Sequence, residues 1–225
     1  MIEIIIINNI KREQMVLHSL LSSQNDFKIA GFGKDGYDAI RLTEELQPDI
    51  AIVDFGLENI TGMELIPIIK RRSPNTAVIL LSPWDDEKHV CDAITCGVSG
   101  YLLKKNDMEK LVNAVRIAHD GGCYVSRGMF TRAFMALSKL ARYQKIYRNF
   151  FSAGENNFVS SHFSQAELRI IKSVCEGQSN KEIAENMSLT IGTVRNYISA
   201  VMQKAGTRNR VQMTIYAIRN GLTEA

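Results

Sequence analysis

Short apolar runs alternate with amphipathic segments over the first 120 residues. The segments between the runs are long enough for helices, as the crossover connections of parallel strands require. The first and fourth runs are almost continuously apolar, which is typical of strands covered on both faces. The five runs lie at Ile2–Ile7, Lys28–Gly31, Ile50–Val53, Ala77–Leu81 and Tyr101–Leu103. The pattern predicts five βα units, and therefore an α/β domain with a five-stranded, doubly wound parallel sheet.

Residues 164–225 have the pattern of four short helices and no strand. The sequence S-x-x-E occurs at 164–167 and again at 179–182, and this capping box satisfies amide groups that a helix start leaves unpaired. Thr190 is suited to cap a third helix over Ile191–Ala205, and a fourth helix over Arg208–Asn220 ends at a glycine. We therefore expect a separate all-α domain of four helices.

The connection between the two patterns is basic and lacks strand periodicity. Asn106 followed by Glu109 predicts the start of the last helix of the sheet domain, and a Gly-Gly pair at 121–122 predicts its end. Apolar residues then recur at helical spacing over Met129–Tyr147, and a polar stretch follows over Ser152–Ser161. The chain is thus predicted to have three parts: a sheet domain at 1–122, a basic linker helix and loop at 123–160, and a helical domain at 161–225.

The net charge of +3 is unevenly distributed. Residues 1–120 carry 13 Lys and Arg against 18 Asp and Glu, whereas residues 121–150 carry six basic residues and no acidic one. Since Lys and Arg supply most non-specific affinity for phosphate backbones, the asymmetry favours a polyanionic partner on the C-terminal side. A solvated basic linker would give the same charges, so composition alone leaves both interpretations open.

Several classes of protein are disfavoured by what the sequence lacks. No signal peptide or long apolar span predicts export or a membrane partner, and the four cysteines have no metal-binding spacing. We therefore expect a cytoplasmic location. No glycine-rich phosphate loop follows a predicted strand, and no His or Cys stands at a strand end as a general base, so we do not expect an enzyme.

Residues 177–206 have the proportions of a helix-turn-helix, with a capped helix, a short break and a second helix. Apolar positions let the two helices pack on each other and leave a polar outer face with Thr193, Arg195, Asn196 and Ser199. Such a face suits the major groove of double-stranded DNA, because arginine can pair with guanine and asparagine with adenine.

The run FSQAELRIIKSVCEGQSNKEIAENMSLTIGTVRNYISAVMQKAGTRNRVQM resembles the LuxR-type DNA-binding domain. It matches that family at Glu167, at Gly177–Ala184, at Thr193–Arg195 and at Arg210. The resemblance implies that the last helix, Arg208–Asn220, forms a homodimer and that six side chains contact DNA. Those implied to face the bases are Arg195, Asn196 and Ser199, and those implied to contact the backbone are Lys181, Thr193 and Tyr197. Tyr197 replaces the family's usual histidine, and Ile191-Gly192 replaces a more polar helix start, which puts the target sequence in doubt.

Polar residues follow four of the predicted strands. Asn8-Asn9, Asp54, Ser82 and Lys104 stand at the carboxyl ends, where an open parallel sheet binds ligands. A carboxylate, a hydroxyl and an ammonium group are the parts needed for phosphoryl transfer to an aspartate. On spacing alone, Asp54 acting as a helix cap and Lys104 as a surface charge remain alternatives.

The order I-V-D, L-L-S and G-Y-L-L-K over residues 1–120, with Gly62 after the aspartate, resembles the flavodoxin-like receiver domain of response regulators. The resemblance implies that Asp54 accepts a phosphoryl group, that Ser82 and Tyr101 are the switch hydroxyl and the switch aromatic residue, and that Lys104 is the receiver lysine. It also implies a sensor histidine kinase as a partner. Together the two resemblances identify the chain as a response regulator of the NarL/LuxR type, and therefore as part of a two-component system.

The sequence departs from the receiver pattern where Asn8 and Asn9 replace two acidic residues that hold magnesium. Because Mg²⁺ requires hard anionic ligands, we expect weak or no metal binding, with Asp54 as the sole anionic ligand. Pro83 in place of a small residue points the same way, whereas Glu58 is a candidate substitute carboxylate. We therefore expect no required cofactor, magnesium only if Asp54 is phosphorylated, and control that does not depend on phosphorylation.

The main prediction is a transcriptional regulator that binds paired DNA half-sites as a dimer, since one helix-turn-helix buries little surface. The nearest alternative is a conventional two-component regulator phosphorylated on Asp54 by a histidine kinase. A small-molecule sensor that uses the sheet pocket and an adaptor that no longer binds DNA also remain open. Salt-dependent binding to a duplex separates the adaptor from the regulator.

Overall fold

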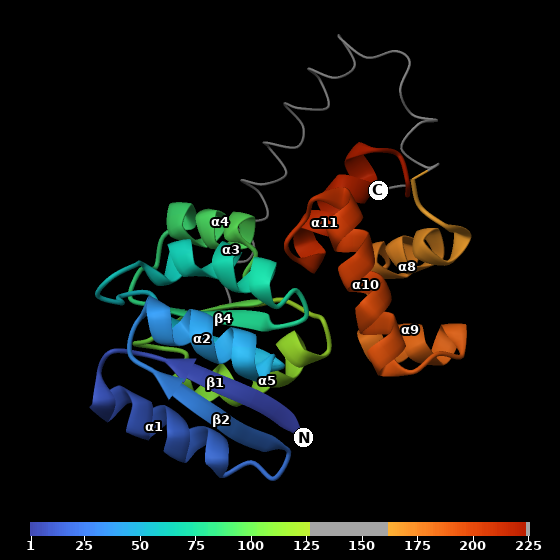
Figure 1. Ribbon diagram of the computed structural model, residues 1–225. Coiled ribbons are helices and arrows are strands. Elements are labelled where there is room, and N and C mark those ends of the chain that lie inside the picture. The colour runs from blue at the N-terminus through green and yellow to red at the C-terminus, as the bar shows by residue number, and fades with distance from the viewer. Residues whose placement is uncertain (127–161, 224–225) are drawn as a thin grey trace.

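The computed structural model describes residues 1–126 and 162–223 (Figure 1). They form a sheet domain and a helical domain, as the alternating and purely helical patterns predict. The predicted linker helix at Met129–Tyr147 and the polar stretch at Ser152–Ser161 lie outside the described residues.

The sheet is fully parallel and has the strand order β2-β1-β3-β4-β5-β6. Its strands are β1 (Ile2–Ile7), β2 (Phe27–Gly33), β3 (Ile50–Asp54), β4 (Ala77–Ser82), β5 (Gly100–Leu103) and β6 (Tyr124–Val125). The five predicted strands are confirmed, and β6 is an addition that pairs with β5 at the sheet edge. Two residues without alternation are too short a pattern to predict a strand, so the sequence analysis assigned them to the linker.

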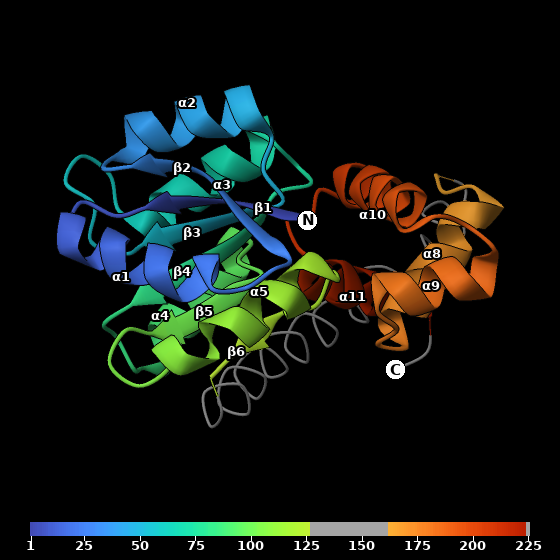
Figure 2. The same cartoon turned by 90° about the horizontal axis from the view of Figure 1, so that it is seen from below.

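Five α-helices and one 3-10 turn connect the strands. They are α1 (Lys11–Ser22), α2 (Gly36–Leu46), α3 (Gly62–Arg72), α4 (Glu87–Cys96), η1 (Met108–Lys110) and α5 (Leu111–His119). Helices α1 and α5 pack on one face of the sheet, and α2, α3 and α4 pack on the other, which gives two apolar cores (Figures 1 and 2). Residues 4–7 of β1 are fully buried between these layers, and a buried isoleucine contributes roughly 1.5–3 kcal/mol.

The start of α5 differs from the prediction. Asn106 does not cap a helix; the chain passes through η1 before α5 begins at Leu111. The neighbouring Asp107 is buried and accepts hydrogen bonds from the Leu103 amide at 3.2 Å and from Ser126. The capping-box spacing was therefore a wrong indicator here, because a buried aspartate fixes this loop from within.

The helical domain contains α8 (Gln165–Cys175), α9 (Asn180–Met187), α10 (Ile191–Ala205) and α11 (Arg210–Arg219). Both predicted capping boxes form: Ser164 and Ser179 each accept from the backbone of the glutamate three residues on, and that glutamate accepts from the serine backbone. Thr190 caps α10 as predicted. The apolar faces of the four helices enclose one core.

The helical domain lies against the amino-terminal edge of the sheet (Figure 2). Helix α11 meets the end of α4, where Asn209 Nδ2 donates to the carbonyls of Ile94 and Val98 at 2.9 and 3.1 Å. Gln212 Nε2 also donates to the Ile94 carbonyl, at 3.2 Å, and to that of Thr95, at 2.5 Å. Among the described residues, no helix combines the length and apolar character needed to cross a membrane.

Candidate functional site

The carboxyl edge of the sheet brings together the polar residues that follow the strands. Asp54 ends β3 and Ser82 ends β4, while Asn8 follows β1 and Lys104 follows β5. Parallel pairing of neighbouring strands aligns these ends. Asn9, which the sequence placed in the same group, is half-buried, and its side chain makes no hydrogen bond within the described residues.

Both carboxylate oxygens of Asp54 are already bonded. Oδ2 accepts from Asn8 Nδ2 at 2.8 Å and from Lys104 Nζ at 2.6 Å, and Oδ1 accepts from the Gly56 amide at 3.1 Å. The Asp54 side chain is 3% exposed, so its charge depends on these partners rather than on water. Both oxygens of the carboxylate that would accept a phosphoryl group are thus engaged by the protein itself.

A second carboxylate enters this pocket from α1. Glu13 Oε2 accepts from Lys104 Nζ at 2.7 Å and from Asn8 Nδ2 at 2.8 Å. Burial acts to raise the pKa of Glu13, and its hydrogen bonds to Lys104 and Asn8 outweigh that effect and lower it. The opposite holds for Lys104, where burial acts to lower the pKa and the two carboxylates raise it.

Glu13 was not singled out from the sequence. The candidate substitute, Glu58, is exposed, and its side chain makes no hydrogen bond or ion pair within the described part of the chain. A carboxylate in the first turn of the helix that follows β1 was the available signal, since the helix starts at the same edge as the strand ends. That signal is weak, because acidic residues also favour a first helical turn for its dipole.

The residues present do not fit a magnesium site. Asn8 points an amide nitrogen at Asp54, and the Lys104 ammonium lies between the carboxylates of Asp54 and Glu13. A hard dication needs several anionic or neutral oxygens, and here a fixed cation stands in their midst. Among the described residues, no three His, Cys, Asp or Glu side chains form a group that could hold a metal.

The two predicted switch residues are bonded to each other. The Tyr101 hydroxyl forms hydrogen bonds with Ser82 Oγ at 2.8 Å and with the Trp84 carbonyl at 2.7 Å. Ser82 Oγ also accepts from the Trp84 amide at 3.1 Å. Tyr101 is fully buried, and burial raises the pKa of its phenol. The indole of Trp84 stacks on the imidazole of His89, with ring centroids 5.3 Å apart.

The second candidate site is the helix-turn-helix formed by α9 and α10. Lys181 and Asn196 are exposed, as a nucleic-acid contact requires. Thr193 is half-buried and its hydroxyl bonds to Thr190 at 2.9 Å, while Tyr197 packs at the margin of the helical core. The replacement of histidine by Tyr197 is therefore accommodated by apolar packing.

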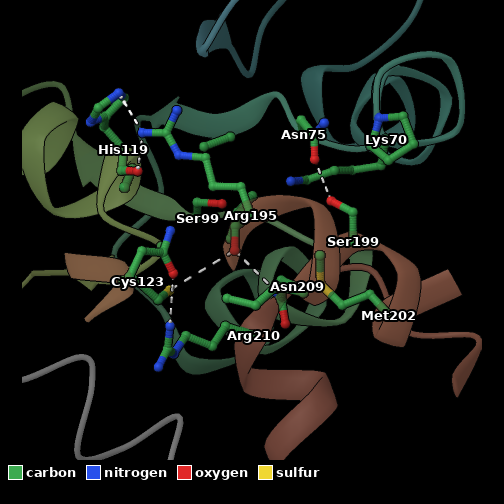
Figure 3. Close-up of a pocket in the computed structure, with 18 residues that line it drawn as sticks. Lys70, Asn75, Ser99, His119, Cys123, Arg195, Ser199, Met202, Asn209 and Arg210 are labelled. Atoms are coloured by element: carbon green, nitrogen blue, oxygen red, sulfur yellow. Dashed lines mark hydrogen bonds between the residues drawn. The ribbon is translucent and has the colours of Figure 1, made fainter. Parts of the chain in front are cut away.

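Two residues of the predicted base-contacting face are bonded to the sheet domain (Figure 3). Arg195 donates to Asp49 Oδ1 at 3.3 Å, and to the carbonyl and Nε2 of His119 at 3.1 and 2.5 Å. Ser199 Oγ bonds to Asn75 Oδ1. The face is outward with respect to the helical core, as predicted, but the sheet domain covers part of it.

In this contact, His119 lies close to both the positive charge of Arg195 and the negative charge of Asp49. Burial lowers the pKa of His119 and the positive charge of Arg195 lowers it further, against the smaller opposing effects of Asp49 and Asp120. A neutral imidazole is the form that accepts the hydrogen bond from Arg195. Neither His119 nor Asp49 could be connected with Arg195 from the sequence, because the pairing depends on how the domains are set together.

The chain matches two family models, one for each domain. Residues 4–116 match the response regulator receiver domain, and residues 161–217 match the bacterial regulatory proteins of the luxR family. The receiver match alone covers half of the chain.

Curated relatives share both domains. The transcriptional regulatory protein LiaR of Bacillus subtilis (strain 168) is 30% identical over 222 residues, with 99% of each chain covered. The transcriptional regulatory protein DegU of Brevibacillus brevis is 27% identical, over 98% of this chain and 94% of its own length. These relatives are named as transcriptional regulators and not as enzymes.

Solved structures share the fold. The RcsB response regulator of Salmonella typhimurium aligns over 96% of this chain and 98% of its own, with a TM-score of 0.54 and 18% identity. A LuxR-family response regulator from Aurantimonas sp. aligns over 61% of this chain and 98% of its own, with a TM-score of 0.57 and 20% identity. The chain therefore belongs to the two-component response regulators and is a DNA-binding transcriptional regulator with a receiver domain and a luxR-type helix-turn-helix.

Proposed function

We propose that this regulator is controlled without phosphorylation of Asp54, by an equilibrium between the closed arrangement described above and an open form that binds DNA. The observation that carries the proposal is the Lys104 ammonium held between Asp54 and Glu13, with Asn8 bonded to both carboxylates. A phosphoryl group arriving at Asp54 would meet the two charge-assisted hydrogen bonds on Oδ2, with no metal to neutralise its own negative charge. No cofactor is needed in this scheme.

The domain contact lies far from Asp54, and this separation also supports control without phosphorylation. Asp49 precedes β3, whereas Asp54 ends it, so the contact with Arg195 and the receiver pocket lie at opposite edges of the sheet. Five residues of strand separate the two edges by about 16 Å. Release of the helical domain can therefore proceed by loss of the contacts at Asp49, Asn75 and His119 without chemistry at Asp54.

In the open form, six side chains are assigned to DNA. Freed from the receiver, α10 presents its outer face to the major groove. The assigned residues are Arg195, Asn196 and Ser199 at the bases, and Lys181, Thr193 and Tyr197 at the backbone. In the closed form two of the three base contacts are used by the receiver, which supports a low affinity for DNA before opening.

Dimerisation through α11 is part of the proposal. One helix-turn-helix buries too little surface for high specificity, so paired half-sites are the expected target. In the closed form Asn209 and Gln212, beside and within α11, are bonded to the end of α4. Opening would therefore free the dimer surface and the DNA surface together. The proposed domains are residues 1–122, 123–160 and 161–225. Strand β6 lies at the start of the 123–160 segment and pairs with the sheet.

Four free cysteines agree with a reducing compartment, and we place the protein in the cytoplasm. A conventional regulator, phosphorylated on Asp54 by a sensor histidine kinase, is the second candidate function. It is favoured by the convergence of Asp54, Ser82 and Lys104 at one edge of the sheet. Magnesium would be required only in that case.

Phosphoryl incorporation separates the two functions. Purified full-length protein is treated with acetyl phosphate and magnesium and resolved on a phosphate-affinity gel. We expect no band shift for the natural chain. The matched gain-of-function control is Asn8→Asp with Asn9→Asp and Glu13→Leu, which restores the acidic pair and removes the extra carboxylate. It should shift, and the shift should disappear when Asp54→Ala is added.

A shift of the natural chain that Asp54→Ala abolishes would overturn phosphate-independent control and favour the conventional function. Binding to DNA is measured on the same samples, with duplexes selected from a random library. Binding by the untreated protein, weakening steeply with salt, is the expected result. Sedimentation of the protein with a selected duplex should give two chains per duplex, and one chain would contradict the dimer.

A further inference from the structure

A groove of about 360 Å³ runs between the two domains, beside the contact of Ser199 with Asn75. The receiver contributes Lys70 and Arg71 from the end of α3, and the DNA-binding domain contributes Arg208 from the loop before α11. No Asp or Glu lines the groove within the described residues. Its volume falls in the range of small-ligand sites, about 300–1,000 Å³.

None of the three cations has a carboxylate partner within the described part of the chain. Lys70 Nζ donates to the carbonyl of Thr76 at 2.7 Å, while the side chains of Arg71 and Arg208 are exposed and form no hydrogen bond or ion pair there. The adjacent Arg72 is different, because it pairs with Glu44 at 2.7 Å. The groove therefore gathers three charges that the protein leaves without a counter-charge.

Lys70 is half-buried, whereas Arg71 and Arg208 are exposed. Burial lowers the pKa of its ammonium to about 8, which means that the surroundings oppose the charge. Cys123, the one titratable group among the described residues that acts to raise the pKa of Lys70, supplies no anion, because burial raises the pKa of that thiol to about 12. An anion in the groove would favour the charged form of Lys70 and supply the counter-charge that the three cations lack.

The end of α3 explains part of this cluster. Cations in a last helical turn stabilise the negative end of the helix dipole, which accounts for Lys70 and Arg71. The α3 dipole does not account for Arg208, which comes from the other domain and whose Cβ lies beside Gly97, the residue that ends α4. The convergence of charges from both domains therefore needs a separate explanation.

The adjoining pocket continues the cationic surface (Figure 3). It shares Lys70 with the groove and adds Arg195 and Arg210 from the DNA-binding domain. Arg210 donates to two neutral groups, the Gln178 carbonyl and Asn180. Burial lowers the pKa of its guanidinium to about 10, against the smaller opposing effects of Cys175 and Glu182. Since Arg195 pairs with Asp49 at 3.3 Å, this pocket adds less uncompensated charge than the groove does.

We propose that this groove binds a small anion with two or more phosphate groups, which bridges Lys70 and Arg71 of the receiver to Arg208 of the DNA-binding domain. The side chains of Ile68 and Met202 also line the groove and offer apolar contacts to a non-polar part of the ligand. Because the bridge exists only when the domains are closed, the ligand stabilises the closed form. It therefore lowers the affinity for DNA, and DNA lowers the affinity for the ligand by the same factor.

The first test is calorimetric titration of the full-length protein with pyrophosphate, at low ionic strength and without magnesium. We expect one site per chain. Arg71→Gln and Arg208→Gln should each weaken binding by roughly tenfold, as loss of a charge-assisted contact does. Both residues are exposed, so these variants should fold normally. The matched control is Arg72→Gln, which removes a neighbouring charge outside the groove and should bind as the natural chain does.

The second test is competition with DNA. Pyrophosphate should weaken binding to a selected duplex more than sodium chloride of equal ionic strength does, and the difference should disappear in the double variant Arg71→Gln, Arg208→Gln. The proposal is overturned if pyrophosphate does not bind, or if it binds equally to all variants. It is also overturned if the variants lose DNA affinity while their pyrophosphate affinity is unchanged, which would assign these cations to the DNA backbone. These measurements do not involve Asp54, so they can fail while phosphate-independent control stands.

Discussion

Arg195 of α10 donates a hydrogen bond of 2.5 Å to Nε2 of His119 at the end of α5. The residue assigned to reading a base is thereby held by a neutral imidazole of the receiver. The contact joins a residue assigned to DNA to an imidazole, the side chain whose ordinary pKa is about 6.5.

Acidic pH should open the molecule. In the closed form, burial, Arg195 and, least of all, the chain's amino terminus depress the pKa of His119 below its ordinary value of 6.5, against the opposing effects of Asp49 and Asp120. In the open form that pKa returns toward its ordinary value, so the closed form binds fewer protons. Its advantage is complete above pH 6.5 and is lost as the pH falls from there through the depressed pKa.

The measurement is energy transfer between dyes on the two domains, at pH 7.5 and pH 5.5. His119→Gln keeps an acceptor that cannot be protonated, and it should remain closed at both values. Equal opening of the natural chain and this variant on acidification would show that another group is responsible.

Weakening the interface away from His119 should raise the affinity for DNA. Asn75→Ala removes the partner of Ser199, and a hydrogen bond of this kind contributes about 0.5–1.5 kcal/mol, or roughly two- to twelvefold in the closed-to-open ratio. Duplex affinity should rise within that range if the closed form dominates. Asn59→Ala is the control, because Asn59 is an exposed loop asparagine outside the interface. No gain for Asn75→Ala relative to this control would mean that the closed form does not limit binding.

The pocket at Asp54 should depend on Lys104 for stability. Lys104→Ala leaves the buried carboxylate of Asp54 without its cation, and breaking a buried pair costs about 3–5 kcal/mol. The cost should lie toward the lower end of that range, since the Lys104 side chain is 26% exposed. Urea unfolding of the natural chain, Lys104→Ala, Asp54→Asn and the double variant gives the coupling free energy between Lys104 and Asp54. If the double variant is as unstable as Lys104→Ala alone, the loss does not come from an unpaired Asp54.

The sequence predicted the parts of this protein that depend on local patterns. Strand runs, the serine capping boxes at 164 and 179, and the polar residues at the carboxyl edge were all confirmed in place, because each is fixed by neighbouring residues. Asn106 was wrong as a cap because the buried Asp107, a tertiary feature, determines that loop. The strand β6 was missed because two residues carry no periodicity.

Contacts between residues that are far apart in the chain could not be predicted from sequence patterns. Glu13 and Lys104 are far apart in the chain and meet only because α1 and β5 start and end at the same edge of the sheet. Likewise Arg195 and Asp49 meet only because the two domains close on each other. A single sequence states neither the domain arrangement nor the partners that it creates.

Residues assigned to bases and to phosphates should respond differently to substitution. Asn196→Ala should cost about 1–3 kcal/mol on a selected duplex and relax the preference at one position, because an amide can pair with one base. Lys181→Ala should weaken binding about equally on all duplexes and reduce the slope of log affinity against log salt by about 1. Both side chains are exposed in the closed form, so neither substitution should disturb the fold or the domain contact. Fluorescence anisotropy over a salt series on the selected duplex and on a scrambled one separates the two effects. A salt slope unchanged by Lys181→Ala would show that Lys181 does not contact the DNA backbone. An equal loss of affinity on both duplexes for Asn196→Ala would show that Asn196 does not read a base.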